Sequence, residues 1–558
     1  MLQEPTSIGE AFRKSFKILM LFHHLVISLL ASLRLMGVLG GSVQNPFLLL
    51  PPDTHMHQQA VVNIFLDCYQ AYKQFAFPHD DLTPVTKSFF DGRNGWGATV
   101  VDAMTTLAIM GQEELFIEAV DFSSKIDFNV SHTSDTVSVF ETTIRYLAGL
   151  LSAYELSGQK FPALIEKAKE VANKMAFAWV PGTSPIPFMN IDFNTSIPIL
   201  ENSVISQAGT LSLEWFTLTK YSGNDTYRKL AEDTVRHIAQ LPAPLPGLAA
   251  QGLNPSTGKS VGAFVTWGSG SDSYFEYLIK YARLTNTDDN LFADTWATAV
   301  DSSLKRLART STVGNHLYLA DQQDDGTLRH IGSHLECFHA GNWMFGGRLL
   351  DNQTIVDTGL ELNEACWNTY ASTMTGIGPE IFGFFSSDGN FTGATPTAED
   401  LAFYEKHGFF LYPQAEYYYL RPEVLESNFY AWRVTGNRTY LDRAASAINS
   451  INKFLKAPVA FAGIWNVNEA DSGFIDDTES FWYAEVLKYL YLTFDDPSHI
   501  NLDEWVFNTE CHPFKAPTAK AVYGSGQVID QSSFGPFKPE SGPLPAVSPA
   551  VKLPARPT

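Results

Sequence analysis

Apolar residues recur at helical spacing along most of this chain, and turns with glycine or asparagine separate one helical stretch from the next. The turns at 222–227 and 435–440 are nearly identical, with Gly-Asn near the centre and a final tyrosine. Glycine suits the left-handed stop of a helix, and asparagine or threonine can cap the helix that follows. After these turns the apolar positions keep to one helix face, at Leu230, Ala231, Val235 and Ile238 and again at Ala444, Ile448, Ile451 and Leu455. The pattern predicts hairpins of two helices.

Further turns of this kind, each followed by phenylalanine, occur at Gly111, Gly158 and Asn286. Repeats of roughly 50 to 65 residues fit two helices and a loop each, so about seven pairs fit between residues 57 and 513. We therefore predict an all-α fold. Periodicity alone leaves open whether the pairs form an open solenoid or a closed toroid, although a toroid would have no exposed ends and would enclose an axial pocket.

The N-terminal region carries a different pattern from the helical repeats. Three basic residues precede an apolar run from Ile18 to Leu33, which is shorter than the about 20 residues of a typical membrane-spanning helix. We interpret residues 1–50 as a leader with a secretory signal peptide or a signal anchor, which leaves the bulk of the chain lumenal. An anchor of this type would attach the protein to a membrane.

The C-terminal region also departs from the helical pattern. Residues 514–558 are rich in proline, serine and glycine, and this composition predicts a disordered tail. No obvious linker interrupts the part between the two ends. We therefore expect one large domain over residues 51–513.

Composition narrows the classes of partner. The chain has 38 Lys and Arg residues against 60 Asp and Glu residues, a formal net charge of −22, and no helix with a run of basic residues. Such a surface repels nucleic acid, so we expect no nucleic-acid partner. The 40 Phe and 22 Tyr residues exceed what packing alone usually needs, and aromatic rings make flat platforms for sugar rings.

Cysteine spacing and glycosylation motifs bear on the compartment. The four cysteines show no C-x-x-C spacing, which argues against a zinc knuckle or a thioredoxin-type motif and leaves one or two disulfides compatible with the sequence. Six N-x-Ser/Thr motifs modestly favour a secretory route, because chance would also give several in a chain of this length. These motifs begin at Asn129, Asn194, Asn224, Asn352, Asn390 and Asn437.

Several carboxylates stand in aromatic and apolar surroundings. Buried carboxylates are unfavourable unless they are paired, hydrogen-bonded, linked to a metal or protonated. If these groups converge in the fold, they form an acid/base site. The segments are Phe140–Glu141, Asp272–Glu276, Arg421–Glu426, Glu479–Glu485 and Phe507–Glu510.

The same segments resemble glycoside hydrolase family 47, the class I α-1,2-mannosidases, and most closely its secretory fungal members. The resemblance covers roughly residues 60 to 513 in order. It implies an (αα)7 barrel closed at one end by a small β-hairpin, and calcium-dependent, inverting hydrolysis of terminal α-1,2-linked mannose from high-mannose N-glycans. The segments that carry it are 75–82, 94–98, 139–146, 149–154, 272–278, 420–427 and 506–513.

Three carboxylates are the candidate catalytic groups. Glu141 and Arg145 are four residues apart and share a helix face, so the arginine can hold the carboxylate or position a sugar hydroxyl. The resemblance implies that Glu141 is the general acid and that Asp272 is also catalytic, and the sequence leaves open which of the two delivers the proton. Glu423 follows a proline that opens a helix, where the positive helix end keeps a carboxylate ionised. The resemblance makes Glu423 the general base.

The resemblance also assigns binding roles. It implies that Thr509 is the direct protein ligand of Ca²⁺, through its hydroxyl and carbonyl oxygens, and that Cys337 and Cys366 form a disulfide. Cys68 and Cys511 are then free thiols or a second bridge. Glu276 is expected to be a supporting residue. The expected substrate-binding residues are Arg145, His334, Arg421, Glu426, Phe481, Glu485 and Glu510.

Two positions depart from the family pattern. Gly270 stands where the endoplasmic-reticulum members carry an arginine, so we expect a wider pocket and the removal of several mannoses per glycan. Thr105 replaces an aspartate common in the family, which we expect to weaken local structure rather than chemistry. We expect a monomer in the secretory pathway, in the Golgi or endoplasmic-reticulum lumen or secreted.

Two alternatives come from other classes of protein. One is a catalytically weak, mannose-binding protein of glycoprotein degradation with the same barrel, and the other is a non-enzymatic helical-repeat scaffold. Retention of Glu141, Asp272, Glu423 and Thr509 favours the enzyme. A scaffold would not need carboxylates among aromatic residues.

Overall fold

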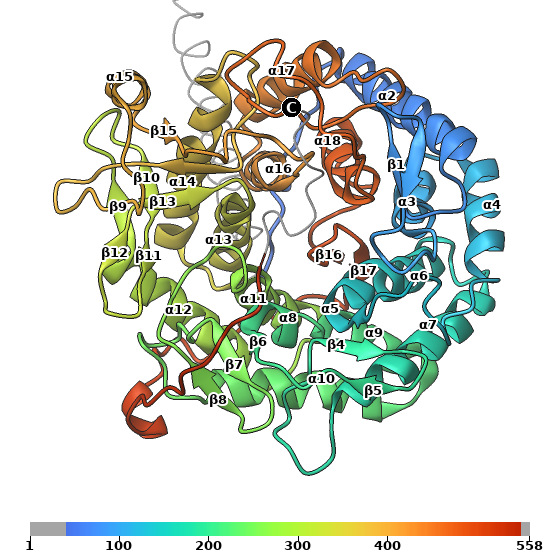
Figure 1. Ribbon diagram of the computed structural model, residues 1–558, viewed down its shortest axis with the longest axis horizontal. Helices are drawn as coiled ribbons and strands as arrows, with labels where there is room; N and C mark the ends of the chain where they lie inside the picture. The colour runs from blue at the N-terminus through green and yellow to red at the C-terminus, as the bar shows by residue number, and fades with distance from the viewer. Residues whose placement is uncertain (1–40, 548–558) are drawn as a thin grey trace, which may run out of the picture.

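Two concentric rings of helices make up most of the computed structural model, which describes residues 41–547 (Figure 1). The inner helices are buried on nearly all sides, whereas the outer helices bury one apolar stripe and expose charged residues. The inner ring consists of α3 (Ala98–Ile109), α6 (Ala148–Leu156), α9 (Ser212–Ser222), α11 (Asp272–Thr285), α13 (Phe338–Leu349), α16 (Glu423–Thr435) and α18 (Leu487–Phe494). The outer ring consists of α4 (Glu113–Ser123), α7 (Pro162–Met175), α10 (Asp225–Ala239), α12 (Leu291–Arg306), α14 (Gln353–Ala371), α17 (Thr439–Phe454) and α2 (Thr54–Phe75).

The helices pair as the sequence pattern predicts. Six of the seven inner helices pack against the outer helix that follows in the chain, as in α9 with α10 and α16 with α17. Gly223 and Gly436 end α9 and α16 in the left-handed conformation. Asn224 caps α10 through its side chain, which accepts a hydrogen bond from the Thr226 amide. The prediction of helical hairpins is confirmed.

The rings are closed. The last inner helix, α18, packs against α2 from the start of the domain, and the segment that leads into α18 packs against α3. The chain is therefore a toroid with seven helical pairs over the described residues, not an open solenoid. Closure leaves an axial space that is lined by inner helices and by the loops and turns that precede them.

Short strands connect the helices and lie outside the rings or across their centre. All named pairs are antiparallel, and the hairpin of β16 and β17 lies across the middle of the ring (Figure 1). This hairpin matches the expected plug. The strands are β1 (Asp81–Thr83), β2 (Ser88–Phe90), β3 (Val137–Ser138), β4 (Asn190–Asp192), β5 (Ile197–Pro198), β6 (Ser203–Val204), β7 (Gly252–Asn254), β8 (Lys259–Val261), β9 (Ala308–Thr310), β10 (Leu317–Leu319), β11 (Asp321–Gln322), β12 (Leu328–Arg329), β13 (Ile331–Ser333), β14 (Ile381–Gly383), β15 (Phe410–Leu411), β16 (Trp505–Phe507) and β17 (Pro513–Lys515).

Two inner helices begin with a π-helical turn beside the axial space. The turns η1 (Thr142–Leu147) and η4 (Trp482–Val486) precede α6 and α18. A π-helical turn widens the helix locally, and such turns occur frequently at functional sites. The remaining short helices are α5 (Val139–Glu141), α8 (Ile205–Gly209), α15 (Ala398–His407), η2 (Ala176–Ala178), η3 (Leu335–Cys337) and η5 (Gln531–Phe534).

Both ends of the described chain contact the barrel. The predicted signal sequence or anchor lies in residues 1–40, outside the described residues. Within 41–547, no helix is long and apolar enough to cross a membrane. Asp503 accepts hydrogen bonds from the Val43 and Gln44 amides, so contacts with the barrel begin before the predicted domain boundary at residue 51.

The described part of the predicted disordered tail, 514–547, differs from that expectation. Residue 515 ends strand β17, and the chain then runs along the outside of the barrel with hydrogen bonds to it. One example is the Lys520 ammonium, which donates to the Thr287 carbonyl (2.7 Å). Composition alone could not anticipate these partners, because they lie in the α11–α12 hairpin, more than 200 residues earlier in the chain.

Candidate active site

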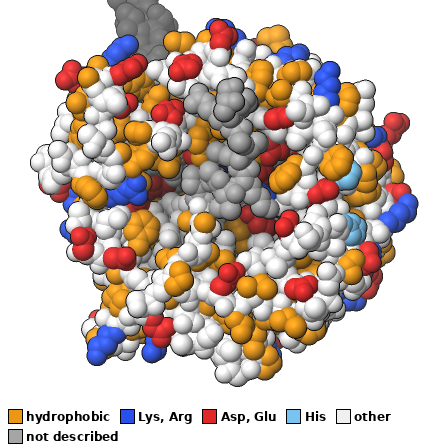
Figure 2. Space-filling model, viewed as in Figure 1, with side chains coloured by type: hydrophobic (Ala, Val, Ile, Leu, Met, Phe, Trp, Pro, Cys, Tyr) orange, Lys and Arg blue, Asp and Glu red, His pale blue; other side chains and the backbone are white. Residues whose placement is uncertain are grey.

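A cavity of about 660 Å³ opens on the axis of the barrel and gathers most of the residues proposed from the sequence. Figure 2 shows Asp and Glu side chains beside the centre of this face of the molecule. Nearly every inner helix or its preceding loop contributes to the lining. The proposed residues that line the cavity are Glu141, Arg145, Asp272, Arg421, Glu423, Glu426, Phe481, Glu485, Thr509 and Glu510.

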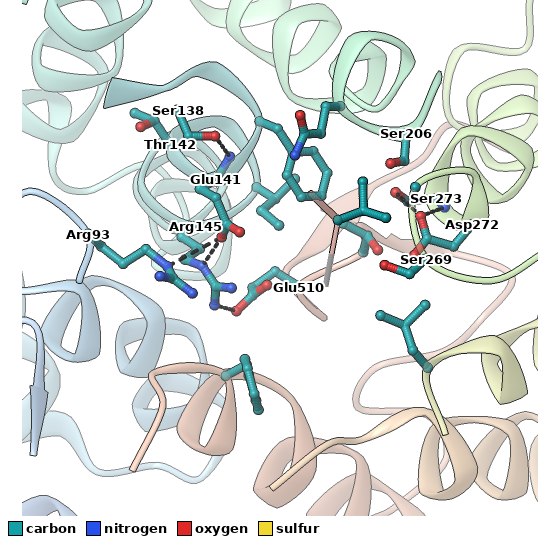
Figure 3. A pocket seen from close by; sticks show the side chains of 18 of the residues that line it. Arg93, Ser138, Glu141, Thr142, Arg145, Ser206, Ser269, Asp272, Ser273 and Glu510 are labelled. Atoms are coloured by element: carbon teal, nitrogen blue, oxygen red, sulfur yellow. Dashed lines mark hydrogen bonds and ion pairs between the residues drawn. The ribbon is translucent and has the colours of Figure 1, made fainter. Parts of the chain in front are cut away.

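One side of the cavity holds Glu141 between two arginines. The Arg145 Nε donates to Glu141 Oε2 (2.8 Å), and the Arg93 Nε lies 3.4 Å from the same oxygen (Figure 3). Arg145 also donates to Glu510 and stands 5.6 Å from the centre of the Phe481 ring. Two guanidinium groups favour the ionised form of a carboxylate. The predicted Glu141–Arg145 pair is present, although Arg145 lies in the π-helical turn η1.

Asp272 faces this group across the cavity, at the first position of α11 (Figure 3). Its Oδ1 accepts hydrogen bonds from the Ser273 amide (2.8 Å) and hydroxyl (3.3 Å). Burial nevertheless raises the pKa of Asp272 to about 7. The side chain is therefore protonated in a substantial fraction of molecules near neutral pH, which suits a proton donor.

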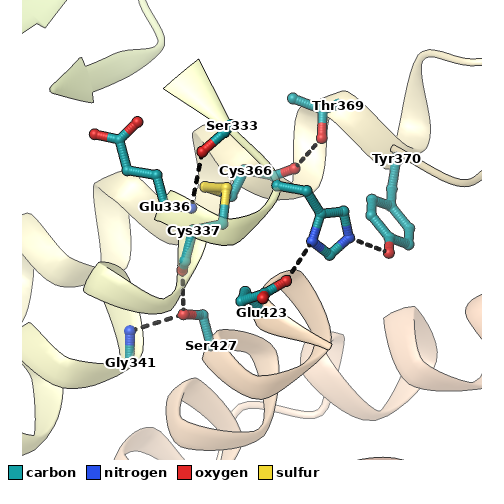
Figure 4. The surroundings of a disulfide bond; sticks show 10 residues. Ser333, Glu336, Cys337, Gly341, Cys366, Thr369, Tyr370, Glu423 and Ser427 are labelled. Carbon is teal, nitrogen blue, oxygen red and sulfur yellow. Dashed lines mark hydrogen bonds and ion pairs between the residues drawn. A yellow bond between two sulfur atoms is a disulfide. The ribbon is translucent and has the colours of Figure 1, made fainter. Parts of the chain in front are cut away.

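Glu423, at the first position of α16, makes a different set of contacts. Its Oε2 lies 2.7 Å from His334 Nδ1, and His334 Nε2 lies 2.7 Å from the Tyr370 hydroxyl (Figure 4). Burial acts to raise the pKa of Glu423, but the His334 hydrogen bond and the Arg421 charge outweigh it, and the pKa falls below its ordinary value. The carboxylate stays ionised and is poised to accept a proton. His334 itself lies behind Glu423 and does not line the cavity.

Arg421 is fixed from behind by a residue that sequence reasoning did not identify. Its Nε donates to both carboxylate oxygens of Glu380 (2.7 and 2.8 Å), just ahead of strand β14. This pair is buried. Glu380 therefore holds the Arg421 guanidinium at the cavity wall but does not line the cavity itself. Its position in Gly-Pro-Glu was a weak signal, because one acid before a strand is unremarkable by sequence.

The floor of the cavity is formed by the loop of the β16–β17 hairpin, with Thr509 at its centre. The Thr509 amide donates to the Tyr277 hydroxyl (3.3 Å), while its side-chain hydroxyl makes no hydrogen bond with another of the described residues. Burial raises the pKa of Glu485 and of Glu510 well above the ordinary value, and their mutual repulsion adds to the shift of Glu485. Burial and repulsion by Glu276 raise the pKa of Glu426 to about 8.

This concentration of buried acid needs a compensating charge. Among residues 41–547, no three His, Cys, Asp or Glu side chains converge closely enough to hold a metal ion by themselves. A free threonine hydroxyl, surrounded by carboxylates that repel one another, is a donor set of hard oxygen atoms with excess negative charge. That set fits a hard divalent cation that keeps several waters.

A buried network supports Arg145 from the side away from the cavity. The Ser480 hydroxyl and His512 Nε2 (3.2 Å) both bond to Asp102, whose carboxylate lies 3.5 Å from the Arg145 guanidinium. Burial lowers the pKa of His512 to about 4, so this ring is neutral near pH 7. Thr105 completes the network, because its hydroxyl lies 2.9 Å from His512 Nδ1. The departure at position 105 is thus accommodated by a hydrogen bond.

The structure has the disulfide that the resemblance implied, and the other two cysteines are free thiols. Cys337 and Cys366 form a disulfide between η3 and α14, close to His334 and Glu423 (Figure 4). Cys68 and Cys511 are free and buried. Arg93 and Tyr419 are among the cavity residues that the sequence did not reveal, since both lie in loops without helical periodicity.

Comparison with known proteins agrees with this site. The family model described as glycosyl hydrolase family 47 matches residues 64–516. Mannosyl-oligosaccharide alpha-1,2-mannosidase 1B from Emericella nidulans is 39% identical over 482 residues, which cover 82% of this chain and 93% of that protein. The protein of the same name from Aspergillus phoenicis is 37% identical over 483 residues, which cover 83% of this chain and 92% of that protein.

A solved structure is also similar. The alpha-1,2-mannosidase from Trichoderma reesei superposes with a TM-score of 0.79 at 34% identity, over 83% of this chain and 99% of that chain. The barrel thus accounts for nearly all of that solved chain. The family match ends at residue 516, so the segment from 517 onward lies outside it.

Proposed function

The chain belongs to glycosyl hydrolase family 47, and we propose that it removes terminal α-1,2-linked mannose from high-mannose N-glycans by calcium-dependent, inverting hydrolysis. It is a glycosidase, as its relatives are. The observation that carries the proposal is the meeting of Glu141, Asp272 and Glu423 in one axial cavity above Thr509. Acids on separate faces of the barrel would have excluded it.

We assign the general acid to Asp272 and the general base to Glu423. The raised pKa of Asp272, about 7, keeps a proton available for the leaving glycosidic oxygen. The lowered pKa of Glu423 keeps it ready to take a proton from the attacking water. In an inverting glycosidase, acid and base stand on opposite sides of the sugar ring with room for that water. Glu141, held by two arginines, then positions and polarises groups around the leaving oxygen.

Thr509 would hold the calcium ion through its hydroxyl and carbonyl oxygens, with Glu485, Glu510 and Glu426 reaching it through water. When bound, such an ion binds sugar hydroxyls and acidifies a water that it touches. Residues of the chain make the remaining contacts with the substrate. Phe481 offers a ring face to the sugar, and Arg421, fixed by Glu380, donates to sugar hydroxyls.

Gly270 bears on how many mannoses are removed. It lines the cavity two residues before Asp272, so no large side chain projects into the mouth from this position, although the Gln251 and Val547 side chains pack beside the glycine. We propose that the barrel can trim several α-1,2-linked mannoses per glycan. We propose that the protein works as a monomer, because one chain supplies all the residues to which a role is assigned here.

We propose a secretory location, in the Golgi or endoplasmic-reticulum lumen or outside the cell. The disulfide suits an oxidising compartment. The asparagines of all six glycosylation motifs are exposed, as acceptor sites must be. They are Asn129, Asn194, Asn224, Asn352, Asn390 and Asn437.

The test is incubation of the purified protein with a high-mannose glycan, with and without a calcium chelator, while released mannose is measured. We expect the protein to release mannose when calcium is present. The chelator should abolish this release, and added calcium should restore it.

The variant Glu423→Gln should lose roughly a hundred- to ten-thousandfold in kcat, the usual contribution of a general base. Glycan binding without release would favour the mannose-binding alternative, and no binding at all would favour the scaffold.

A further inference from the structure

The segment from residue 517 to 547 follows the barrel from one end to the other. It runs beside the α11–α12 hairpin, where the Tyr523 hydroxyl donates to the Asn286 side chain (2.6 Å) and the Ile529 amide donates to the Thr298 hydroxyl (3.0 Å). Figure 1 shows the deep-red end of the chain running from the rim of the ring toward its centre. The segment lies beyond the family match, so it is an addition to the shared domain.

Glu540 fastens the segment to the mouth of the barrel. Its amide donates to the Ser260 carbonyl (2.8 Å), and its carbonyl accepts from the Gly262 amide (3.0 Å), which extends the edge strand β8. Its carboxylate accepts hydrogen bonds from the Asn254 amide group (2.8 Å) and the Thr257 hydroxyl (3.0 Å). The backbone and the side chain are thus both held.

Beyond Glu540 the chain turns into the catalytic cavity. The Asn202 side chain donates to the Pro543 carbonyl (2.8 Å), and Leu544 packs where Gly252 has no side chain. Pro545, Ala546 and Val547 then line the same cavity as Asp272 and Glu423. A Cβ atom placed on Gly270 would stand 2.8 Å from Gln251 Nε2 and 3.2 Å from Val547 Cγ1, so the segment shares the space beside this glycine with the Gln251 side chain.

The chemistry of the segment suits this position. From residue 541 to the C-terminus the sequence has no Asp or Glu, so nothing in it is repelled by the carboxylates of the cavity. Its prolines restrict the unbound chain, which lowers the entropy lost when the segment is held. A sugar that entered by the α11 side of the mouth would meet this segment first.

We propose that residues 540–547 are a wall of the substrate mouth that discriminates by size: they admit a short α-1,2-linked mannoside and hinder the branches of a complete high-mannose glycan. The inference rests on the proposed mannosidase activity and refines it. The mouth beside Gly270 is wider for a second branch of the glycan when Val547 leaves this glycine.

The experiment compares two substrates, an α-1,2-linked mannose disaccharide and a high-mannose glycan, with the full chain and with a chain that ends after Pro539. Truncation should raise kcat/KM for the glycan by roughly tenfold, as expected if the segment occupies the mouth about nine-tenths of the time. It should leave kcat/KM for the disaccharide within about twofold. An unchanged ratio between the two substrates would overturn the proposal.

Two point variants test the same proposal without truncation, in case the shortened chain does not fold. Leu544→Asp places a negative charge in the apolar contact with Gly252 and beside an acidic cavity. This variant should release the segment and raise kcat/KM for the glycan but not for the disaccharide. Gln527→Asp adds the same charge at an exposed position outside residues 540–547 and should change the turnover of neither substrate. Equal effects of the two variants would contradict the proposal. If the full chain does not cleave the disaccharide at all, the proposed mannosidase activity itself is wrong.

Discussion

At the scale of single residues, the surroundings of two carboxylates in the site shift their pKa values in opposite directions. Asp272 is largely buried without an ion pair to an arginine or lysine among the described residues, and this burial raises its pKa. Glu423 is also largely buried, yet His334 and Arg421 lower its pKa. Pairs of titratable groups whose surroundings move their pKa values apart are typical of acid and base roles.

These opposite shifts predict the pH profile. The general acid must be protonated, so kcat/KM should be fully present below the pKa of Asp272, about 7, and should fall about tenfold per pH unit above it. The general base must be ionised, so activity should persist down to below the ordinary glutamate range, because the pKa of Glu423 is lowered. The measurement is initial rate against pH at constant calcium. A profile that rises above pH 7 would contradict the assignment.

A substrate that needs no proton can separate the roles of Asp272 and Glu141. In α-mannosyl fluoride the leaving group departs without protonation, so Asp272→Asn should lose roughly a hundredfold or more on the glycan but much less on the fluoride. Glu141→Gln should lose activity on both substrates, since its carboxylate orients Arg145 and Arg93. The reverse pattern would make Glu141 the proton donor.

At the scale of elements, helical spacing could predict pairs of residues within one helix but gave no information on residues in loops. The i, i+4 pair of Glu141 and Arg145 follows from helical spacing, although η1 shifts its geometry by a π-helical turn. Arg93 and Glu380 come from loops about 50 and 240 residues away from Glu141, and only the closed ring brings Arg93 to the cavity wall and Glu380 behind it. Spacing reports neighbours along a helix; it does not report neighbours across a barrel.

The disulfide makes an element-scale prediction. It joins η3 to α14 across a sequence separation of 29 residues, beside the segment that carries His334. The double variant Cys337→Ala, Cys366→Ala should lower the free energy of unfolding by about 3 to 4 kcal/mol, because the unfolded chain gains the entropy of an open loop. Urea unfolding measures the change. Cys68→Ala, which removes a buried thiol without cutting a bridge, should cost about 1 kcal/mol; equal losses would contradict the role of the bridge.

At the scale of the whole molecule, ring closure creates the site. Repeats in the sequence predicted about seven hairpins, but the contact of α18 with α2 joins the two ends of the domain and turns them into a toroid with an axis. The hairpin loop that carries Thr509 then lies on that axis, among acids from several inner helices. The C-terminal segment could not be placed from sequence, because its partners are glycines, backbone carbonyls and single polar side chains that are scattered over distant parts of the chain.

The most direct test of the account is the configuration of the first mannose released. Proton NMR of the anomeric region, recorded in the first minutes after the enzyme is added to an α-1,2-linked mannose oligosaccharide, distinguishes the two anomers before they interconvert. Direct attack by water activated at Glu423, with proton delivery from Asp272, predicts β-mannose as the first product. α-Mannose as the first product would contradict it.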